Sequence, residues 1–310
     1  MEQGGLAMRI RIDQGRSFAS GVGRSGAASS MAGFTLVEML VALVVALVII
    51  GAAYSTYVAQ QRHFGNERLV MRTQQNLRGA LLVFEQELRM AGYDPEDAGG
   101  FGLVDVRRYD VIRYRECSPD GQPVLFYTYD VDENGLLDDR KQGRNIEHAK
   151  FRISDVHNDG HICLTWDNGG GRFPLAENIQ AVGFAYAVDR DGDGDCDLWP
   201  GGTDLIWAVD SDNDNLLDAD IDTNGDGAID EKDDANGDHR IDTADGRVLK
   251  PQVALDRVKA IRVWVMAVTP GRLSGVDDVD NHVVGDRIFT PVKDGRKRFV
   301  LQTRVQCRNL

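Results

Sequence analysis

Residues 33–54 read GFTLVEMLVALVVALVIIGAAY, and this stretch decides the fold. The 16 residues from Met39 to Tyr54 are apolar or glycine without a break, and adding residues 34–38 gives 21 positions. A helix needs about 20 such residues to cross a bilayer. Residues 1–33 carry four arginines against two acidic residues, and a positive flank keeps its side of a membrane segment cytoplasmic. The sequence therefore predicts an N-terminal membrane anchor.

One carboxylate lies inside this apolar stretch. Glu38 is the only charged residue between Phe34 and Tyr54, and an ionised group in a membrane segment is costly unless it has a partner. A general secretory signal is cut after its apolar region, whereas here the apolar run follows Gly33. A cut after Gly33 would create a new amino group on Phe34, close enough to pair with Glu38.

The sequence GFTLVE before a long apolar helix resembles the type IV prepilin signature. The resemblance implies cleavage between Gly33 and Phe34 by a prepilin peptidase, and methylation of the new N-terminus. It also implies that Glu38 pairs with the Phe34 amine of this or a neighbouring subunit. Residues 1–33 would then be a leader peptide. This leader is long and has no basic residue immediately before Gly33, which points to a start at a downstream methionine such as Met8. A plain signal anchor that contains a glutamate is the alternative.

A second pattern extends the helix beyond the membrane. Apolar residues recur at spacings of 7, 4, 3 and 4, as on one face of a helix. They are Val70, Leu77, Leu81, Phe84 and Leu88. Gly92 is a typical C-terminal cap, and Pro95 cannot continue a helix. We therefore expect one helix over 34–92, whose first half crosses the membrane while its second half packs on a head.

Three further segments resemble one group of type IV pilins. LRMAGYDP at 88–95 is similar to the end of the helix in minor pilins of the PilW type, which are related to the J-type minor pseudopilins of type II secretion. VKAIRVWVMAV at 258–268 and RKRFVLQTRVQCRNL at 296–310 resemble the last strands of that family. The resemblance implies a non-enzymatic minor pilin in the inner membrane that helps to initiate or stabilise pilus assembly. Its partners would be other minor and major pilins, through the N-terminal helix. A minor pseudopilin of a type II secretion system, whose filament stays periplasmic, is the alternative.

After Pro95 the sequence changes to short alternating runs between turn residues, a pattern typical of strands. The runs lie at 103–115, 123–129, 149–154, 161–166, 178–188, 258–268 and 298–306. An antiparallel sheet packed on the long helix accommodates them, so the predicted class is α+β. Residues 93–310 would form this head, on the periplasmic or extracellular side.

Neither the cysteines nor the histidines form a recognisable catalytic motif. None of the four cysteines lies in a CxxC pair, and in an exported chain they permit two disulfides with three connectivities. They are Cys117, Cys163, Cys196 and Cys307. Asp, His and Cys alternate over 155–163 as metal ligands can, but a hairpin turn explains that run more simply. No nucleophile and base are paired by a known motif, so we do not expect an enzyme.

The net charge of −14 comes from one region. Between Asp189 and Asp245 the chain has 20 acidic and three basic residues, a local charge of −17. Such a surface favours cations as partners, and it excludes nucleic acid.

Five segments place oxygen-bearing side chains at positions 1, 3, 5 and 9 of a 12-residue unit. Each is named below by its first residue: the 210, 222 and 234 loops follow one another directly, and the 130 and 189 loops lie apart. The candidate ligands are Asp130, Asp132, Asn134 and Asp138, then Asp189, Asp191, Asp193, Asp195 and Asp197, then Asp210, Asp212, Asp214 and Asp218, then Asp222, Asn224, Asp226, Asp230 and Asp233, and finally Asp234, Asn236, Asp238, Asp242 and Asp245.

This spacing is typical of calcium loops. Calcium takes six to eight oxygen ligands at about 2.3–2.6 Å, and a chain that bends back at position 6 directs positions 1, 3, 5 and 9 at one centre. Gly or Asn at position 6 tolerates the left-handed backbone that the bend needs. The apolar residue at position 8, such as Ile229 or Ile241, is expected to pack against a neighbouring loop. Zinc is disfavoured because almost all ligands are carboxylates. An acidic disordered linker is the alternative.

The units resemble the loops of dockerins and EF-hand proteins but lack the helices that follow such loops. The tandem array is therefore more similar to thrombospondin type 3 repeats, which implies a compact chain of loops around ions with little core of its own. It would form an insertion at 189–250 within the head, disordered without calcium. His239 at position 6 makes affinity at the 234 loop doubtful. The insertion would either stiffen the head or contact a surface ligand or tip protein, as in a calcium-dependent pilus-tip adhesin.

Overall fold

The computed structural model describes residues 33–109, 121–138, 146–155 and 162–310. The chain divides into two compact units, one ending at Thr56 and one running from Tyr57 to Leu310, and each is considered by itself. Helix α1 (Leu36–Leu88) passes through both units. Of the described residues, α1 alone forms a helix long and apolar enough to cross a membrane. Its side chains within the first unit are exposed.

The C-terminal end of α1 is capped from the far end of the chain. After Leu88 the backbone turns away through Gly92, which has the left-handed φ of 74° that favours glycine at this position. A Cβ atom on Gly92 would lie 2.5 Å from the carbonyl oxygen of Asn309. The side-chain amide of Asn309 donates to the carbonyl of Arg89 at 3.0 Å. The last residues of the sequence therefore close the end of the first helix.

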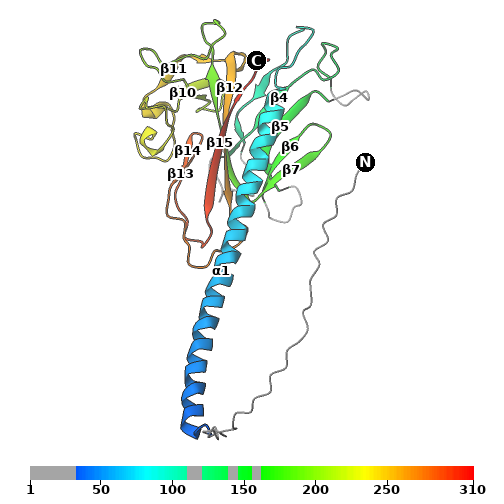
Figure 1. The fold of residues 1–310 in the computed structure, drawn as a ribbon. Helices are drawn as coiled ribbons and strands as arrows, with labels where there is room; N and C mark the ends of the chain where they lie inside the picture. Colours follow the sequence, from blue (N-terminus) through cyan, green and yellow to red (C-terminus); the bar gives the residue numbers. More distant parts are fainter. Residues whose placement is uncertain (1–32, 110–120, 139–145, 156–161) are drawn as a thin grey trace, which may run out of the picture. The chain divides into compact units, whose positions relative to one another are not determined.

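Two antiparallel sheets form the body of the second unit (Figure 1). The five-stranded sheet has the order β1 (Leu103–Asp105), β4 (Leu125–Thr128), β5 (His148–Ser154), β6 (Cys163–Asp167), β7 (Arg172–Glu177). The six-stranded sheet has the order β11 (Val248–Val253), β10 (Leu217–Asp220), β9 (Ala208–Val209), β8 (Ile179–Val188), β12 (Val258–Val268), β15 (Arg298–Gln306). Two short pairs complete the described strands: β2 (Arg108–Tyr109) with β3 (Gln122–Pro123), and β13 (His282–Val284) with β14 (Arg287–Phe289).

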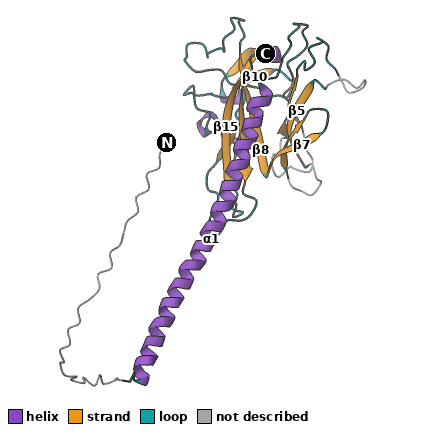
Figure 2. Cartoon of the chain, turned by 45° about the vertical axis from the view of Figure 1, so that its right-hand side comes forward, coloured by secondary structure: helices purple, strands orange, loops and turns teal. Residues whose placement is uncertain are grey.

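The second half of α1 packs its apolar face against both sheets (Figure 2). The buried helix residues are Thr73, Leu77, Ala80, Leu81, Phe84 and Leu88. They include four of the five positions that the spacing predicts, and the fifth, Val70, is half-buried. These side chains share one core with Leu125 and Phe151 of the five-stranded sheet and with Val182 and Val263 of the six-stranded sheet. The predicted α+β class, a long N-terminal helix packed on antiparallel strands, is confirmed.

A second apolar layer covers the opposite face of the six-stranded sheet. Ala185 and Trp264 of the sheet pack there with Val284 of the β13–β14 hairpin and with Ile241 of the 234 loop. The hairpin can approach closely because β8 carries Gly183 at this point, where a Cβ atom would lie 2.6 Å from the backbone nitrogen of Gly285. The 234 loop thus contributes to this layer as part of the fold, and Ile229 of the 222 loop packs against it.

The segment 189–250 contributes more core than the sequence indicated. It supplies β9, β10 and the start of β11, and all four residues of β10 are buried although two of them are aspartates. Leu217, Ile221 and Ile241 are fully buried. The expected chain of loops with little core of its own is therefore wrong in this respect: the segment extends the six-stranded sheet. Strands β9 and β10 have no clear sequence pattern, because they are two and four residues long and β10 is rich in Asp, a residue depleted in strands.

Replacing Phe84 with alanine is expected to destabilise the second unit by about 3–5 kcal/mol. The Phe84 side chain is fully buried. Its ring centroid lies 4.2 Å from that of Phe151 and 5.9 Å from that of Phe184, so one ring joins the helix to both sheets. Denaturant unfolding of the full-length protein in detergent measures the change. Leu82→Ala, at an exposed position of the same helix, is the control, and an equal loss in both variants would contradict this role of Phe84.

Candidate metal centres and the N-terminal motif

The five acidic loops share one backbone conformation, which the carboxylate at position 1 holds. In the 222 loop, Asp222 accepts hydrogen bonds from the backbone N–H groups of Gly225 at 2.9 Å and Gly227 at 3.0 Å. The first residue of each other loop accepts from its own positions 4 and 6 at 2.6–3.0 Å. Asn224 at position 3 likewise accepts from the N–H of Asp226 at 2.8 Å. These bonds turn the chain tightly around the candidate ligands.

Two positions of every loop have left-handed backbone, of which the sequence predicted only position 6. Position 6 has φ between 68° and 94°, in Gly135, Gly194, Asn215, Gly227 and His239. Position 4 has φ between 59° and 81°, in Glu133, Gly192, Asn213, Gly225 and Gly237. The presence of Gly or Asn at position 4 of four loops could have predicted this second left-handed position. His239 adopts the required conformation, so it does not prevent the 234 loop from forming.

Replacing His239 with glycine is expected to stabilise the protein by about 1 kcal/mol, because a non-glycine residue is strained in the left-handed region. The His239 side chain is more than half exposed, so little packing is lost. Gly237→Ala in the same loop is the opposite control. A Cβ atom there meets nothing within 4 Å, so only backbone strain is added and a loss of about 1 kcal/mol is expected. Denaturant unfolding measures both, and changes of the same sign would refute the strain explanation.

In the 222 and 234 loops, the carboxylate at position 12 closes the loop. Asp233 accepts from the backbone N–H of Asn224 at 3.2 Å, and Asp245 accepts from that of Asn236 at 3.1 Å. Each closing residue therefore returns to position 3 of its own loop, so the shorter Asp in place of the usual Glu still reaches across.

The position 9 carboxylates of these two loops are engaged elsewhere. Asp230 caps the short helix Glu231–Asp233 and pairs with Lys232 at 2.9 Å. Asp242 caps the equivalent helix Thr243–Asp245 and pairs with Arg240 at 2.9 Å. Their main described contacts are thus with local backbone and with the few basic residues of the segment.

The 189 and 210 loops are closed by position 9 instead. Position 12 in these loops is occupied by proline and isoleucine, which offer no side-chain oxygen. Asp197 accepts from the backbone N–H of Arg190 at 3.0 Å, and Asp218 accepts from that of Ser211 at 2.8 Å. Both contacts reach position 2 of the loop, one residue earlier than in the other two loops.

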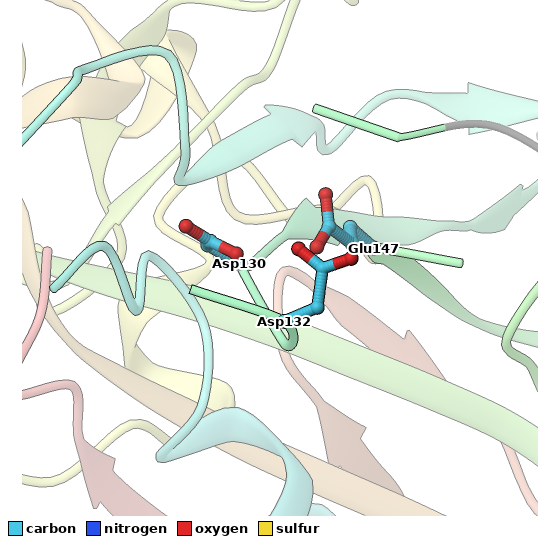
Figure 3. A group of neighbouring side chains, drawn as sticks. All are labelled: Asp130, Asp132 and Glu147. Carbon is cyan, nitrogen blue, oxygen red and sulfur yellow. The ribbon is translucent and has the colours of Figure 1, made fainter. Parts of the chain in front are cut away.

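The 130 loop is closed by a residue that sequence reasoning missed. Glu147, just before β5, accepts from the backbone N–H groups of Val131 at 3.1 Å and Asp138 at 2.8 Å. Figure 3 shows the carboxylates of Asp130, Asp132 and Glu147 gathered together, and one oxygen from each lies within 4.8 Å of the others. Glu147 lies beyond the 12-residue unit, and only the antiparallel pairing of β4 with β5 returns it to the loop.

Burial and hydrogen bonding act in opposite directions on these carboxylates. Burial alone would raise the pKa of Asp130, but the backbone N–H groups it accepts outweigh burial, and the pKa is lowered. Burial raises the pKa of Glu147, and it also raises the pKa values of Asp210, Asp218 and Asp233. A raised pKa means that the ionised form is undercompensated where it lies. A bound cation would supply the missing charge.

Among the described residues, three groups of carboxylates each bring one oxygen per residue to within 4.8 Å of one another. They are Asp130, Asp132 and Glu147, then Asp189, Asp191 and Asp197, and finally Asp210, Asp212 and Asp214. The other predicted carboxylate ligands of these loops fall outside the groups, namely Asp138, Asp193, Asp195 and Asp218. Within the described part of the chain, the 222 and 234 loops form no such carboxylate group, and their position 3 ligand is an amide.

The apolar residues at position 8 pack mainly on the body of the second unit. Leu217 joins the core beneath α1, and Ile241 joins the layer on the other face of the six-stranded sheet, where Ile229 is partly buried. Leu137 of the 130 loop is exposed. Ile229 and Ile241, at position 8 of neighbouring loops, thus belong to one apolar cluster that also includes residues of the sheet, whereas Leu217 lies in the core beneath α1.

The N-terminal residues form a capping box at the start of α1. The backbone N–H and hydroxyl of Thr35 donate to a Glu38 carboxylate oxygen at 2.9 and 3.0 Å, and the Glu38 N–H donates to the Thr35 hydroxyl at 3.2 Å. Such reciprocal bonds satisfy helix N–H groups that have no intrahelical acceptor. Phe34 is 83% exposed, and within the described part of the chain no neighbouring atom lies within 4 Å of a Cβ built on Gly33. In the chain before cleavage, Glu38 is thus paired with Thr35, three residues away.

Some of the cysteines and histidines considered in the sequence lie outside the described residues. Cys117 and the histidines of the 155–163 run lie there, and every predicted disulfide connectivity includes Cys117. Among the described residues, Cys196 and Cys307 carry free thiols and are not bonded to each other. Burial raises the pKa of the Cys307 thiol to about 12, which makes it unreactive.

Comparison with known proteins identifies the N-terminal segment. Residues 29–54 match the family model of the prokaryotic N-terminal methylation motif. The chain therefore carries a prepilin-type methylation motif that leads directly into its apolar helix. Among solved structures, the chain is similar to a type IV-like pilin from Thermus thermophilus, with 13% sequence identity and a TM-score of 0.37 over 77% of this chain and 98% of that chain. No curated protein matches the sequence.

Proposed function

We propose that this protein is a non-enzymatic minor pilin, anchored in the inner membrane and assembled with other pilins through α1. The observation that carries the proposal is the methylation motif at 29–54, which runs without a break into a helix able to cross a membrane. Cleavage after Gly33 would free the Phe34 amine. It would also release Glu38 from its capping bonds to Thr35, because the new amine is a stronger partner for a carboxylate in an apolar environment.

An exposed apolar stripe on α1 supports assembly through helix packing. Within the second unit, Tyr57, Phe64, Met71 and Leu82 are 57%, 60%, 56% and 55% exposed. Their spacings of 7, 7 and 11 residues keep them on one side of a helix. This side is distinct from the face that packs on the sheets. A row of large exposed apolar residues is what a neighbouring pilin helix would cover.

The PilW type is the finer assignment that we propose. Two of the three segments whose sequences resemble that type, 88–95 and 296–310, lie in contact with each other, because Asn309 packs on Gly92 and bonds to Arg89. These two parts of the resemblance therefore meet at the capped end of α1, which supports the proposal.

We further propose that the head carries several calcium ions in its acidic loops. Three carboxylate groups converge, their loops share one conformation, and burial of several ligands leaves ionised oxygens undercompensated. Two like charges 4 Å apart repel by about 4 kcal/mol at an effective dielectric constant of 20, so such groups favour a divalent cation. Ligand sets made of carboxylate oxygens suit calcium better than softer metals. Glu147 would be the longest side chain among the ligands.

Filament composition tests the pilin proposal. Filaments sheared from producing cells are expected to contain peptides of residues 57–310, and Glu38→Val is expected to remove them while the protein stays in the membrane. Glu67→Val replaces a glutamate of the same helix that is half-exposed, and it should assemble normally. Recovery only from periplasmic filaments would support the pseudopilin alternative. Equal assembly of the Glu38 and Glu67 variants would overturn the proposed role of Glu38, and absence from all filaments would overturn the pilin proposal.

A further inference from the structure

The 210 loop is joined to a distant segment by the side chains at its two left-handed positions. The Asn213 side-chain oxygen accepts from the backbone N–H of Arg108 at 2.6 Å, and its amide nitrogen donates to the Arg108 carbonyl at 3.2 Å. The Asn215 side-chain oxygen accepts from the N–H of Val106 at 3.1 Å, and its amide nitrogen donates to the carbonyl of Val104 at 3.0 Å. Two side chains thus take the place of a neighbouring strand along alternate residues.

These bonds connect the two sheets. Residues 103–109 contain β1, an edge strand of the five-stranded sheet, and β2. The 210 loop joins β9 to β10 of the six-stranded sheet. The 189 and 222 loops have glycine at both left-handed positions and cannot make such contacts. Asparagine tolerates the same left-handed backbone and adds a side-chain amide. The 210 loop therefore keeps the conformation of the other loops and also binds residues 104–108.

The orientation of both asparagines depends on the candidate cation ligand. The backbone N–H groups of Asn213 and Asn215 donate to the carboxylate of Asp210 at 2.7 and 2.9 Å. Asp212 and Asp214 each bring an oxygen to within 4.8 Å of Asp210. Without a cation, repulsion among these three carboxylates would oppose the closed loop conformation that positions both amides.

We propose that cation occupancy of the 210 loop controls the docking of residues 103–109, so that this loop is a latch between the two sheets. The inference rests on the calcium binding proposed above. When the latch opens, the side chain of Arg108 stays paired with Asp286, next to β14. The segment therefore remains tethered, and its backbone N–H groups at positions 106 and 108 become accessible to solvent without global unfolding.

Hydrogen–deuterium exchange of the full-length protein in detergent tests the latch. Removing calcium with a chelator is expected to accelerate exchange in peptides covering 103–109 at least tenfold, because the acceptors for the Val106 and Arg108 amides are lost. The Asn213→Gly, Asn215→Gly double variant keeps a backbone that favours the loop. It should show the same fast exchange in saturating calcium, with its calcium stoichiometry by titration calorimetry unchanged.

Two further variants separate the outcomes. Asp210→Asn is expected to lose one calcium ion and the protection of 103–109, whereas Asp222→Asn makes the same change in the next loop and should leave that protection intact. If Asp210→Asn does not fold, the Asn213→Gly, Asn215→Gly double variant still tests whether the two amides protect residues 103–109. Calcium binding with unchanged exchange at 103–109 would overturn the latch and leave the proposed function standing. A calorimetric titration without calcium binding would overturn the calcium proposal itself, and the latch with it.

Discussion

Removal of calcium is expected to lower the melting temperature of the full-length protein by roughly 15 °C or more. A ligand at 100 times its dissociation constant stabilises the folded state by about 2.7 kcal/mol, so three occupied groups would contribute about 8 kcal/mol. One kcal/mol corresponds to about 2–4 °C in a domain of this size. The effect is global because the 130 loop lies between β4 and β5 of the five-stranded sheet, whereas the 189 and 210 loops connect strands of the six-stranded sheet.

Thermal unfolding in detergent with millimolar calcium, with chelator and with millimolar magnesium measures this effect. Magnesium should restore little stability, because it demands a smaller octahedral site and gives up its water reluctantly. A triple variant of Asp130→Asn, Asp189→Asn and Asp210→Asn should melt early and respond weakly to calcium. A melting temperature that neither calcium nor chelator moves would contradict the calcium proposal. Point substitutions are preferable to loop deletion, which would also remove β9 and β10.

Replacing Gly33 with valine is expected to abolish processing, whereas the unaltered protein should begin at an N-methylated Phe34. The position is exposed and, among the described residues, no atom lies within 4 Å of a Cβ atom added there, so valine should not disturb the described fold. The effect would come from the peptidase, which must accept the residue before the cut. N-terminal sequencing and intact mass of protein from cells that contain a prepilin peptidase distinguish the two forms.

Gly51→Val is the matched control for processing. Gly51 lies in the same apolar run and also has no neighbour within 4 Å of an added Cβ atom, but it is far from the cut. It should be processed as the unaltered protein is. A mature N-terminus other than Phe34, or equal processing of both valine variants, would refute the prepilin interpretation of residues 29–54.

The elements with strong periodicity could be predicted from the sequence. The spacing from Val70 to Leu88 identified the packed face of α1. The predicted bounds of β5, β8, β12 and β15 differ from the observed bounds by no more than one residue. Long, regular elements carry their own signal because each residue repeats it. Strand β10 reads LDAD and is buried in full, and no local pattern distinguishes it from a calcium-loop segment.

Candidate ligands that lie within a single 12-residue loop could be predicted from the sequence. Positions 1 and 3 of the 130, 189 and 210 loops lie in the carboxylate groups that the structure forms. Glu147 was not predictable, because sheet pairing and not sequence spacing brings it to Asp130. The docking role of Asn213 and Asn215 was equally hidden, since in the sequence they look like ordinary substitutes for glycine.

The contact between Asn309 and the end of α1 has a consequence for the order of folding. Arg89 and Asn309 are separated by 220 positions, and Asn66 and Ser274, which also bond to each other, by 208. Folds dominated by such distant pairs form slowly. During synthesis, α1 leaves the ribosome early, but the residue that closes its end follows 220 positions later. The end of α1 therefore stays unsealed until the strands between these two residues have been made, and a variant without the Asn309 amide would leave the Arg89 carbonyl without this partner.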